Sequence, residues 1–346
     1  MIEKNSNPFS LDSGRVPNVL VSSFRQVDDI IDAFSEESPA FHSSFISGIQ
    51  GIGKTVSLTY IAKFFRGQDD WVVVELNPEK DMLLQLAAKL NEEKTLKIIF
   101  SNAKINLSFF GIGAEIEGAD PIRELSVAVE RMLVSLKRRR KKVLVIIDDI
   151  IPNENLRSFA YDYLMLVRQD LPVFLLVTSL YDNMQALQDS NSLSYLSRIP
   201  RISLASLDIN LIAEQYSLLF QICPEKASQM ANMTNGYPFA FQLLGYLTWE
   251  YGCDSVRINT EFRRCLAEYV YDKVWENLSH KEQSFLYDIA KAKEDSKLVK
   301  MNREYNSSHY FLYYRRLINK GIIRCGKSGC LDFALPSFDE YILEYE

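Results

Sequence analysis

Residues 48–55 read Gly48-Ile49-Gln50-Gly51-Ile52-Gly53-Lys54-Thr55, and this stretch decides the fold. Two glycines with four residues between them, followed by Lys and Thr, form the phosphate-binding loop (P-loop) pattern. Glycines let the backbone turn tightly so that its N–H groups face a phosphate, and the helix that follows adds its positive dipole end. The pattern predicts that Lys54 reaches the β- and γ-phosphates of a nucleotide and that Thr55 is a ligand of Mg²⁺.

The flanking sequence supplies the order of strand, loop and helix that this pattern requires. Phe45-Ile46 predicts a short strand before the loop, and residues 56–65 predict a helix after it. The alternative interpretation is a glycine-rich turn that only looks like a P-loop. The nucleotide-binding residues predicted from the loop are Gly48, Gly51, Ile52, Gly53, Lys54, Thr55 and Val56.

A second informative stretch is the apolar run at 143–147, which ends in Asp148 and Asp149. It has the form of a Walker B strand, because acids at the carboxyl end of a buried strand lie where open α/β sheets bind ligands. We expect Asp148 to hold Mg²⁺ and Asp149 to orient or deprotonate the attacking water. Without the P-loop, the same pattern would indicate only a strand that leads into a capped turn.

Polar residues also end the buried strand predicted at 173–179. In a P-loop fold with a strand inserted between the two motif strands, this place holds a sensor for the γ-phosphate or the attacking water. Thr178 or Ser179 is the candidate, and the alternative is an ordinary strand-end hydroxyl that binds a loop. Arg198 precedes a strand predicted at 201–204 and is interpreted either as an arginine finger toward a neighbouring subunit or as a surface residue.

A further apolar run at 71–76 brings the predicted strands to five, and their near-continuous apolar character is typical of a parallel sheet buried on both faces. Residues 94–118 alternate in hydrophobicity and contain glycines, which favours a β-hairpin over a mobile insertion. The basic run 137–142 is interpreted as a solvated helix end, with a nucleic-acid patch as the alternative. The helices predicted in this half are 24–34, 81–90, 121–137 and 154–170.

Composition limits the classes of protein that fit. The 346 residues are 47% hydrophobic and 24% charged, as in an average globular protein, and the formal net charge of -6 does not by itself indicate nucleic acid. Five cysteines without a CxxC pair and three dispersed histidines argue against a Cys/His zinc site. No signal-peptide core or long apolar run is present, so we expect no membrane segment and a cytoplasmic location.

The strands stop after residue 207, and helices are predicted at 208–220, 224–233, 238–249 and 254–277. The turn Asn235-Gly236-Tyr237-Pro238 joins two of them, because Gly ends one helix and Pro opens the next. A capping box of Ser279 and Glu282 then begins a helix, a second helix covers 307–319, and two short strands surround a turn at 326–329.

Helix, helix and hairpin in this order are typical of a winged-helix domain. Its second helix carries side chains that suit phosphate contacts in duplex DNA. Acids and bases nearly balance from Lys273 onward, so packing or protein contacts are the alternative role. The candidate DNA-contacting residues are His309, Tyr313, Tyr314, Arg315, Arg316 and Lys320, with Lys327 at the tip of the hairpin.

The P-loop, the Asp148-Asp149 strand, the hydroxyl-ended strand, Gly236-Tyr237-Pro238 and the terminal winged helix together resemble the AAA+/STAND group of P-loop ATPases. Prokaryotic relatives of the Orc1/Cdc6 initiators and the STAND regulators are the most similar members. The resemblance implies ATP and Mg²⁺ as ligands, with Pro238 near the nucleotide. The sequence departs from the group at two places. Most members have Gly-Arg-Glu after the N-terminal arm, whereas residues 22–26 retain only Arg25 of these three residues. Many members also have Glu at the position of Asp149.

The sequence therefore predicts an α/β protein: a P-loop NTPase with a parallel five-stranded sheet and a helical lid, followed by an α+β winged-helix domain. The expected boundaries are 1–206 for the arm and ATPase core, 207–270 for the lid and 271–346 for the winged helix. We expect a slow Mg²⁺-dependent ATPase that acts as a nucleotide-controlled conformational switch.

Two other functions fit the same sequence features. One is an ATP-licensed protein that binds double-stranded DNA, such as a replication initiator or a mobile-element factor. The other is a defence or signalling switch that forms a homo-oligomer or binds a protein partner. A GTPase is disfavoured because no Asn-Lys-x-Asp motif is present, and an ABC subunit because no Leu-Ser-Gly-Gly-Gln stretch occurs.

Overall fold

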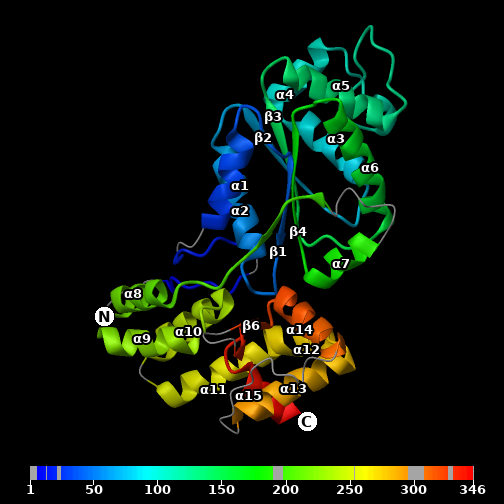
Figure 1. Cartoon of the computed structure of the whole chain (residues 1–346). Helices are drawn as coiled ribbons and strands as arrows, with labels where there is room; N and C mark the ends of the chain where they lie inside the picture. The colour runs from blue at the N-terminus through cyan, green and yellow to red at the C-terminus, as the bar shows by residue number, and fades with distance from the viewer. Residues whose placement is uncertain are drawn as a thin grey trace. The chain divides into compact units, whose positions relative to one another are not determined.

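The computed structural model describes residues 6–12, 14–21, 25–189, 198–252, 254–294, 308–325 and 330–345. The chain forms two compact units. The sheet unit consists of Arg25–Ser47 and Thr55–Ser203, and the helical unit consists of Met1–Phe24, Gly48–Lys54 and Leu204–Glu346 (Figure 1). In the described part of the chain, no helix has the length and apolar character needed to cross a membrane.

A single sheet of five parallel strands forms the centre of the sheet unit, in the order β2-β3-β4-β1-β5. The predicted parallel five-stranded α/β sheet is confirmed. β4 lies between β1 and β3, so a strand separates the two motif strands, as the sequence indicated. The strands are β1 (Ser43–Ser47), β2 (Trp71–Leu76), β3 (Lys142–Ile147), β4 (Val173–Ser179) and β5 (Arg201–Ser203).

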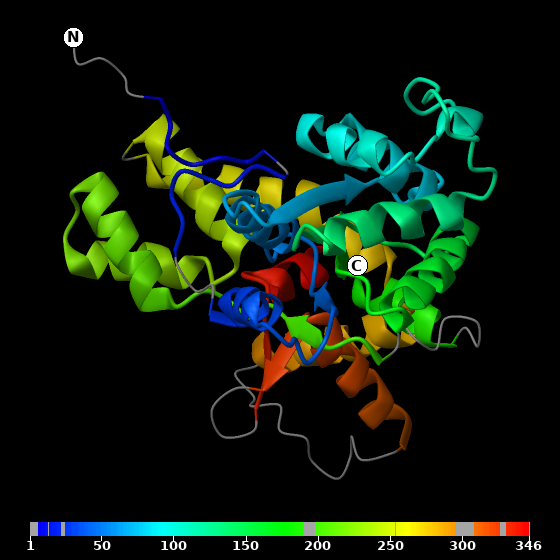
Figure 2. The ribbon, with the colours of Figure 1, turned by 90° about the horizontal axis from the view of Figure 1, so that it is seen from above.

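Alternate residues of the central strands face opposite layers of helices. Val145 and Val177 lie in a buried cluster with residues of α3 (Met82–Glu92), α5 (Leu125–Lys137) and α6 (Glu154–Arg168). On the other face, Phe174 packs against Phe34 of α1 (Arg25–Ser35), with ring centroids 5.2 Å apart. The α2 helix (Lys54–Arg66) covers the same face as α1 (Figure 1, Figure 2). Burial on both faces explains why these strands are apolar throughout.

The structure corrects two predictions in this unit. Residues 94–118 contain α4 (Lys94–Asn102) and a 3₁₀ turn η1 (Ser108–Phe110), and no strand is assigned there. The alternation at Ile105 and Leu107 instead belongs to a loop that is buried beside α4, where Asn106 donates a hydrogen bond to Ala119 O at 2.8 Å. The helix predicted at 121–137 begins only at Leu125. The N–H of Ile122 donates to Asn106 O, so this segment is held against the loop and cannot start the helix.

Three of the six residues in the basic run 137–142 make contacts within the sheet unit. Lys137 Nζ lies 2.7 Å from the Asp170 carboxylate, and Lys141 Nζ donates to Asp69 O at 2.8 Å. Lys142 Nζ lies over the ring of Trp71, 5.2 Å from its centroid. These contacts agree with a helix end that packs beside the strands, while Arg138, Arg139 and Arg140 are exposed.

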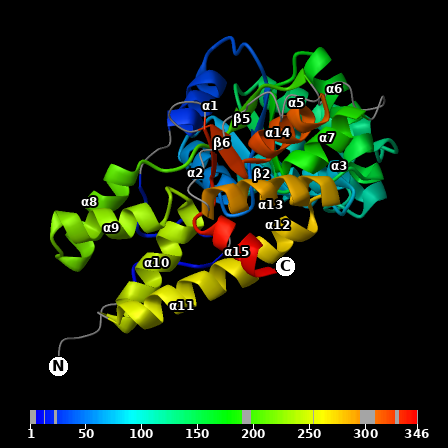
Figure 3. The same cartoon turned by 60° about the horizontal axis from the view of Figure 1, so that its bottom comes forward.

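The helical unit begins with four helices that agree closely with the predicted ranges (Figure 3). They are α8 (Ile209–Phe220), α9 (Pro224–Met233), α10 (Pro238–Tyr251) and α11 (Ser255–Leu266), and α11 continues through a π-helical turn η4 (Ala267–Tyr271) into α12 (Asp272–Glu276). Phe9 of the N-terminal arm is buried in the core of this unit and stacks on Phe220, with ring centroids 5.7 Å apart. Gly245 makes room for it, since a Cβ there would lie 2.2 Å from Cε1 of Phe9.

The end of the chain forms two helices and a hairpin in the predicted order. They are α13 (His280–Glu294), α14 (Ser308–Lys320) and the antiparallel strands β6 (Ile323–Cys325) and β7 (Leu331–Phe333). A further helix that the sequence did not predict, α15 (Phe338–Tyr345), follows them. The predicted capping box is present, because Glu282 Oε2 accepts hydrogen bonds from Ser279 N at 2.9 Å and Ser279 Oγ at 2.8 Å.

Lys320 has a different environment from the one expected of a DNA contact. Its Nζ lies 3.2 Å from Glu282 Oε1, and the Lys320 side chain is only 10% exposed. The Glu282 residue is 3% exposed. The lysine therefore connects the end of α14 to the start of α13 inside the C-terminal region.

Replacing Lys320 by Met should lower the free energy of unfolding by about 3 kcal/mol, because the Glu282 carboxylate would stay buried without its cationic partner. The measurement is urea denaturation of the full chain at neutral pH, followed by circular dichroism. Lys281→Met is the control, since Lys281 is exposed on α13 and precedes Glu282 directly. Equal stabilities of the two variants would contradict a stabilising role for the pair.

The Glu282 carboxylate also predicts a dependence of stability on pH. Burial alone would raise the pKa of Glu282, but hydrogen bonds from Ser279 and the charge of Lys320 outweigh it, so the pKa lies below its ordinary value. A lowered folded pKa means that the stabilisation is complete above the unfolded pKa of about 4.3 and is lost as pH falls through the folded pKa. Lys320→Met removes a charge that lowers the folded pKa of Glu282, so the variant should lose less stability than the wild type as pH falls from about 6 to 3, which denaturation over that range would measure.

Candidate functional site

The P-loop residues Gly48–Lys54 belong to the helical unit by their contacts. Gly51 and Gly53 have φ angles of +76° and +97°, which favour glycine. The ammonium of Lys54 donates hydrogen bonds to Gly48 O at 2.9 Å and to Ile49 O at 3.1 Å. The lysine predicted to contact phosphates thus lies against the backbone of its own loop.

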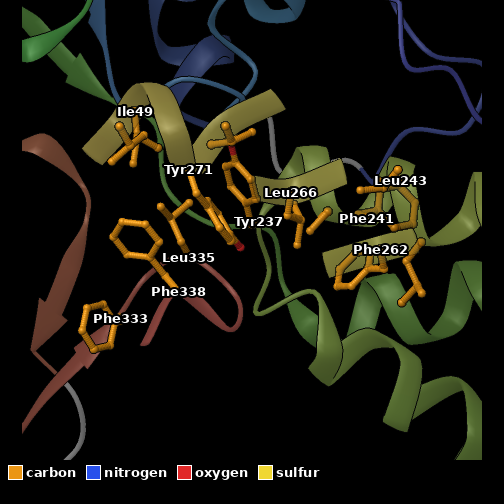
Figure 4. Close-up of a cluster of buried hydrophobic side chains, with 14 of the residues drawn as sticks. Ile49, Tyr237, Phe241, Leu243, Phe262, Leu266, Tyr271, Phe333, Leu335 and Phe338 are labelled. Carbon is orange, nitrogen blue, oxygen red and sulfur yellow. The ribbon is translucent and has the colours of Figure 1, made fainter. Parts of the chain in front are cut away.

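A tyrosine from the turn before α10 covers this loop. Tyr237 Oη donates a hydrogen bond to Gln50 O at 2.5 Å, and the Tyr237 side chain is buried. Ile49 is part of the same apolar cluster as Tyr237 (Figure 4). Pro238 follows Tyr237 directly and is the first residue of α10. The predicted nucleotide neighbour Pro238 is therefore next in sequence to a residue that binds the P-loop.

In the sheet unit, the Asp148 carboxylate joins the start of α2 to the end of β4. Thr55 Oγ1 donates a hydrogen bond to Asp148 Oδ2 at 2.8 Å. Thr178 Oγ1 donates to the other oxygen, Asp148 Oδ1. Two threonines that the sequence singled out for different reasons therefore bind one carboxylate.

Thr178 also fixes the backbone after β3. Its Oγ1 accepts a hydrogen bond from Asp149 N at 2.8 Å, and its carbonyl accepts one from Ile150 N at 2.8 Å. Asp149 has a φ of +52°, which is uncommon for a residue other than glycine, and its side chain is exposed. Ser179, the other sensor candidate, is buried and donates to Ile150 O at 2.7 Å. Thr178 is thus the candidate that contacts both acids, while Ser179 contacts neither.

The remaining candidates are Arg198 and Val56. Arg198 is exposed and forms no hydrogen bond or ion pair with any residue that the structure describes. Val56 follows Thr55 in the first turn of α2. Residues 22–24, part of the stretch where the sequence departs from the AAA+ pattern, lie outside the described residues.

The donor atoms around Asp148 suit Mg²⁺. One carboxylate and one hydroxyl oxygen are hard ligands, and Mg²⁺ commonly takes one or two protein ligands while waters and phosphates complete its shell. Across the described ranges, no group of three or more His, Cys, Asp or Glu residues forms a cage for a metal ion. The Asp148 and Thr55 oxygens are thus of the kind that Mg²⁺ takes from a protein.

Tyr237 and Asn235 are two residues whose contacts the sequence did not predict. The Asn235 side chain donates to Phe333 O at 2.9 Å, and Arg324 donates to Asn235 Oδ1 at 2.5 Å. Gly236 and Pro238 in the sequence predicted the turn. Nothing in the sequence indicated that Asn235 binds Phe333, 98 positions away, or that Tyr237 binds Gln50, 187 positions away.

Comparisons with known proteins bear on the fold and on the C-terminal region. Residues 268–342 match a family model described as a domain of unknown function (DUF8462). A comparison with curated proteins returned no match.

Solved structures that resemble the whole chain include Cdc6p from Pyrobaculum aerophilum, with a TM-score of 0.48, 14% identity, and coverage of 96% of this chain and 97% of that one. The ADP form of ORC2 from Aeropyrum pernix has a TM-score of 0.44 and 15% identity, and the coverage is 99% and 95%. ORC1 from Aeropyrum pernix in complex with DNA has a TM-score of 0.44 and 12% identity, with coverage of 96% and 94%. All three of these TM-scores are below 0.5.

Thr178→Val should lower the free energy of unfolding by about 1–3 kcal/mol, because Asp149 N would lose its acceptor and Asp148 one of its donors. Thr178→Ser keeps the hydroxyl and should retain most of the stability. The measurement is urea denaturation of the full-length variants side by side. If Thr178→Val were as stable as Thr178→Ser, the hydroxyl would not hold this turn.

Proposed function

We propose that the protein binds ATP with Mg²⁺ at its P-loop and hydrolyses it slowly to ADP and phosphate. The observation that carries the proposal is the 2.8 Å hydrogen bond from Thr55 Oγ1 to Asp148 Oδ2. It unites the last residue of the P-loop motif with the first acid of the Walker B motif, 93 positions later. In P-loop NTPases these two residue types hold the Mg²⁺ that accompanies the nucleotide.

Lys54 supports the phosphate-binding part of the proposal. Its ammonium donates to two loop carbonyls, and phosphate oxygens are stronger acceptors than carbonyls because they carry charge. The start of α2 adds backbone N–H groups that attract an anion. The residues proposed to hold the nucleotide are Gly48, Gly51, Ile52, Gly53, Lys54, Thr55, Val56 and Pro238.

Asp148 and Asp149 have different proposed roles. Asp148 and Thr55 are the proposed Mg²⁺ ligands, and the bound ion would supply neutralisation of the charge that develops on the phosphates. Thr178 donates to Asp148 Oδ1 and so holds the carboxylate in place. Asp149 is exposed to water and its backbone is fixed by Thr178, which suits it to orient or deprotonate a water molecule. Asp is one methylene shorter than Glu, which fits slow hydrolysis.

The proposal extends to a conformational switch. Ile49 and Ile52 of the P-loop are part of the apolar core of the helical unit, and Gln50 binds Tyr237 there. A change in the shape of the loop on nucleotide binding would therefore disturb packing within that unit. We propose that this is how nucleotide state reaches the C-terminal region, with a homo-oligomer or a protein partner as the output. Arg198 would act as an arginine finger only in such an oligomer.

Lys54→Ala should weaken ATP binding by at least about 100-fold, because the cation that faces the phosphates would be lost. Lys63→Ala is the matched control, since Lys63 is exposed near the other end of the same helix. Isothermal titration of ATP in the presence of Mg²⁺ measures both affinities. Unchanged affinity in Lys54→Ala would contradict the assignment of the site.

Binding of double-stranded DNA is a second candidate function, favoured by the outer face of α14. Phe311, Leu312, Arg315 and Arg316 are all exposed on this helix, and the Arg315 guanidinium lies over the ring of Phe311 at 4.9 Å. Lys320 instead binds Glu282. Of the other candidates, the side chain of His309 and the whole of Lys327 lie outside the described residues.

If α14 contacts DNA phosphates, Arg315→Ala combined with Arg316→Ala should weaken duplex binding. The slope of the logarithm of the association constant against the logarithm of the salt concentration should fall in magnitude by about 2. Arg138→Ala combined with Arg139→Ala removes the same charge from the end of α5 and serves as the control. Fluorescence anisotropy of a labelled duplex at several salt concentrations measures both pairs. Equal losses in the two pairs would indicate a general charge effect and contradict a role for α14.

A further inference from the structure

The contact between Tyr237 and the P-loop has a consequence for phosphate binding. We propose that Tyr237 is a positioning residue of the P-loop: its hydroxyl fixes the Gln50–Gly51 peptide and thereby directs the Gly51 N–H toward the bound phosphates. This inference rests on the proposed ATP site and adds Tyr237 to the residues that form it.

The hydrogen bond to Gln50 O fixes the orientation of the Gln50–Gly51 peptide. The carbonyl and the N–H of one trans peptide point in opposite directions, and the described residues contain no cis peptide. Tyr237 Oη holds Gln50 O at 2.5 Å, so the N–H of Gly51 must point away from the tyrosine. A P-loop needs its N–H groups turned toward the phosphates and its carbonyls turned outward.

The loop carbonyls differ in the donors that they accept from. Gly48 O and Ile49 O both accept hydrogen bonds from the Lys54 ammonium. These bonds compete with any phosphate that Lys54 is to hold. The bond from Tyr237 to Gln50 O does not involve Lys54, so it can persist when the lysine turns to a phosphate.

The burial of Tyr237 makes its hydroxyl a constant donor. The residue is 1% exposed, and a buried hydroxyl without a partner is costly. Burial also raises the pKa of the Tyr237 phenol well above its ordinary value. The hydroxyl therefore keeps its proton throughout the physiological range, and the Gln50 carbonyl keeps its donor.

Gly51 is adapted to the same tyrosine. A Cβ at this position would lie 2.0 Å from Tyr237 Oη and 3.1 Å from Cβ of Phe239. Its φ of +76° is a second, independent reason for glycine. The absence of a side chain lets the hydroxyl reach the Gln50 carbonyl.

The turn that carries Tyr237 is held in place by its own contacts. Tyr237 N donates to Thr234 O at 2.8 Å, and Gly236 O accepts from Leu207 N at 2.8 Å. Asn235 Nδ2 donates to Phe333 O and to Ala334 O, at 2.9 and 3.2 Å. A group that positions another must itself be supported in this way.

Tyr237→Phe removes only the hydroxyl and is the test variant. Tyr271→Phe is the matched control, because Tyr271 is equally buried in the same unit and also donates to a backbone carbonyl, that of Pro336. We expect Tyr237→Phe to bind ATP and ADP about tenfold more weakly than the wild type, the effect of losing one buried hydrogen bond. Tyr271→Phe should bind both as the wild type does.

Adenosine separates positioning from a general structural effect. It has no phosphates and does not use the Gly51 N–H, so its affinity should be the same in Tyr237→Phe and the wild type. Isothermal titration with ATP, ADP and adenosine, alongside urea denaturation of each variant, supplies these readouts. Equal weakening for all three ligands, or weakening in Tyr271→Phe of the same size, would overturn the inference.

The outcomes also separate this inference from the proposed function. If the wild type binds ATP, Lys54→Ala does not, and Tyr237→Phe binds as the wild type, the ATP site stands and the role of Tyr237 fails. If the wild type binds neither ATP nor ADP, both proposals fail.

Discussion

The arrangement of the sheet unit depends on one carboxylate that accepts hydrogen bonds from two threonines. Asp148 can meet Thr55 and Thr178 together only because β4 lies between β1 and β3 and all three strands end at the same edge. The order of the strands thus decides which side chains become neighbours. A change in that order would separate the acid from both hydroxyls.

Contacts within the helical unit hold the P-loop residues 48–54. Residues 48–54 pack with the helices that follow residue 204, whereas Thr55 and the acids pack with the sheet. The P-loop motif is therefore divided between the two units, with Gly48–Lys54 in one and Thr55 in the other. This explains why apolar residues, Ile49 and Ile52, occur in a loop whose function needs mainly glycine and lysine.

The sequence predicted those features that depend on local chemistry or on a strong motif. The strands, the capping box of Ser279 and Glu282, and the opening of α10 by Pro238 were all visible in it. The failures occurred where distant contacts outweighed local signals. The helix predicted at 121–137 has a proline at its first position, yet the bond from Ile122 to Asn106 delays its start to Leu125. The spacing of α14 could not show that Lys320 faces Glu282, and no pattern paired Tyr237 with Gln50.

The N-terminal arm is part of the helical core, as Phe9 shows. Its ring fills the space left by Gly245 and stacks on Phe220. A chain trimmed past residue 9 would contain an apolar void the size of a phenyl ring between α8 and α10. Such voids cost stability in proportion to their volume, so the arm should be treated as an interior element when the protein is shortened or fused at that end.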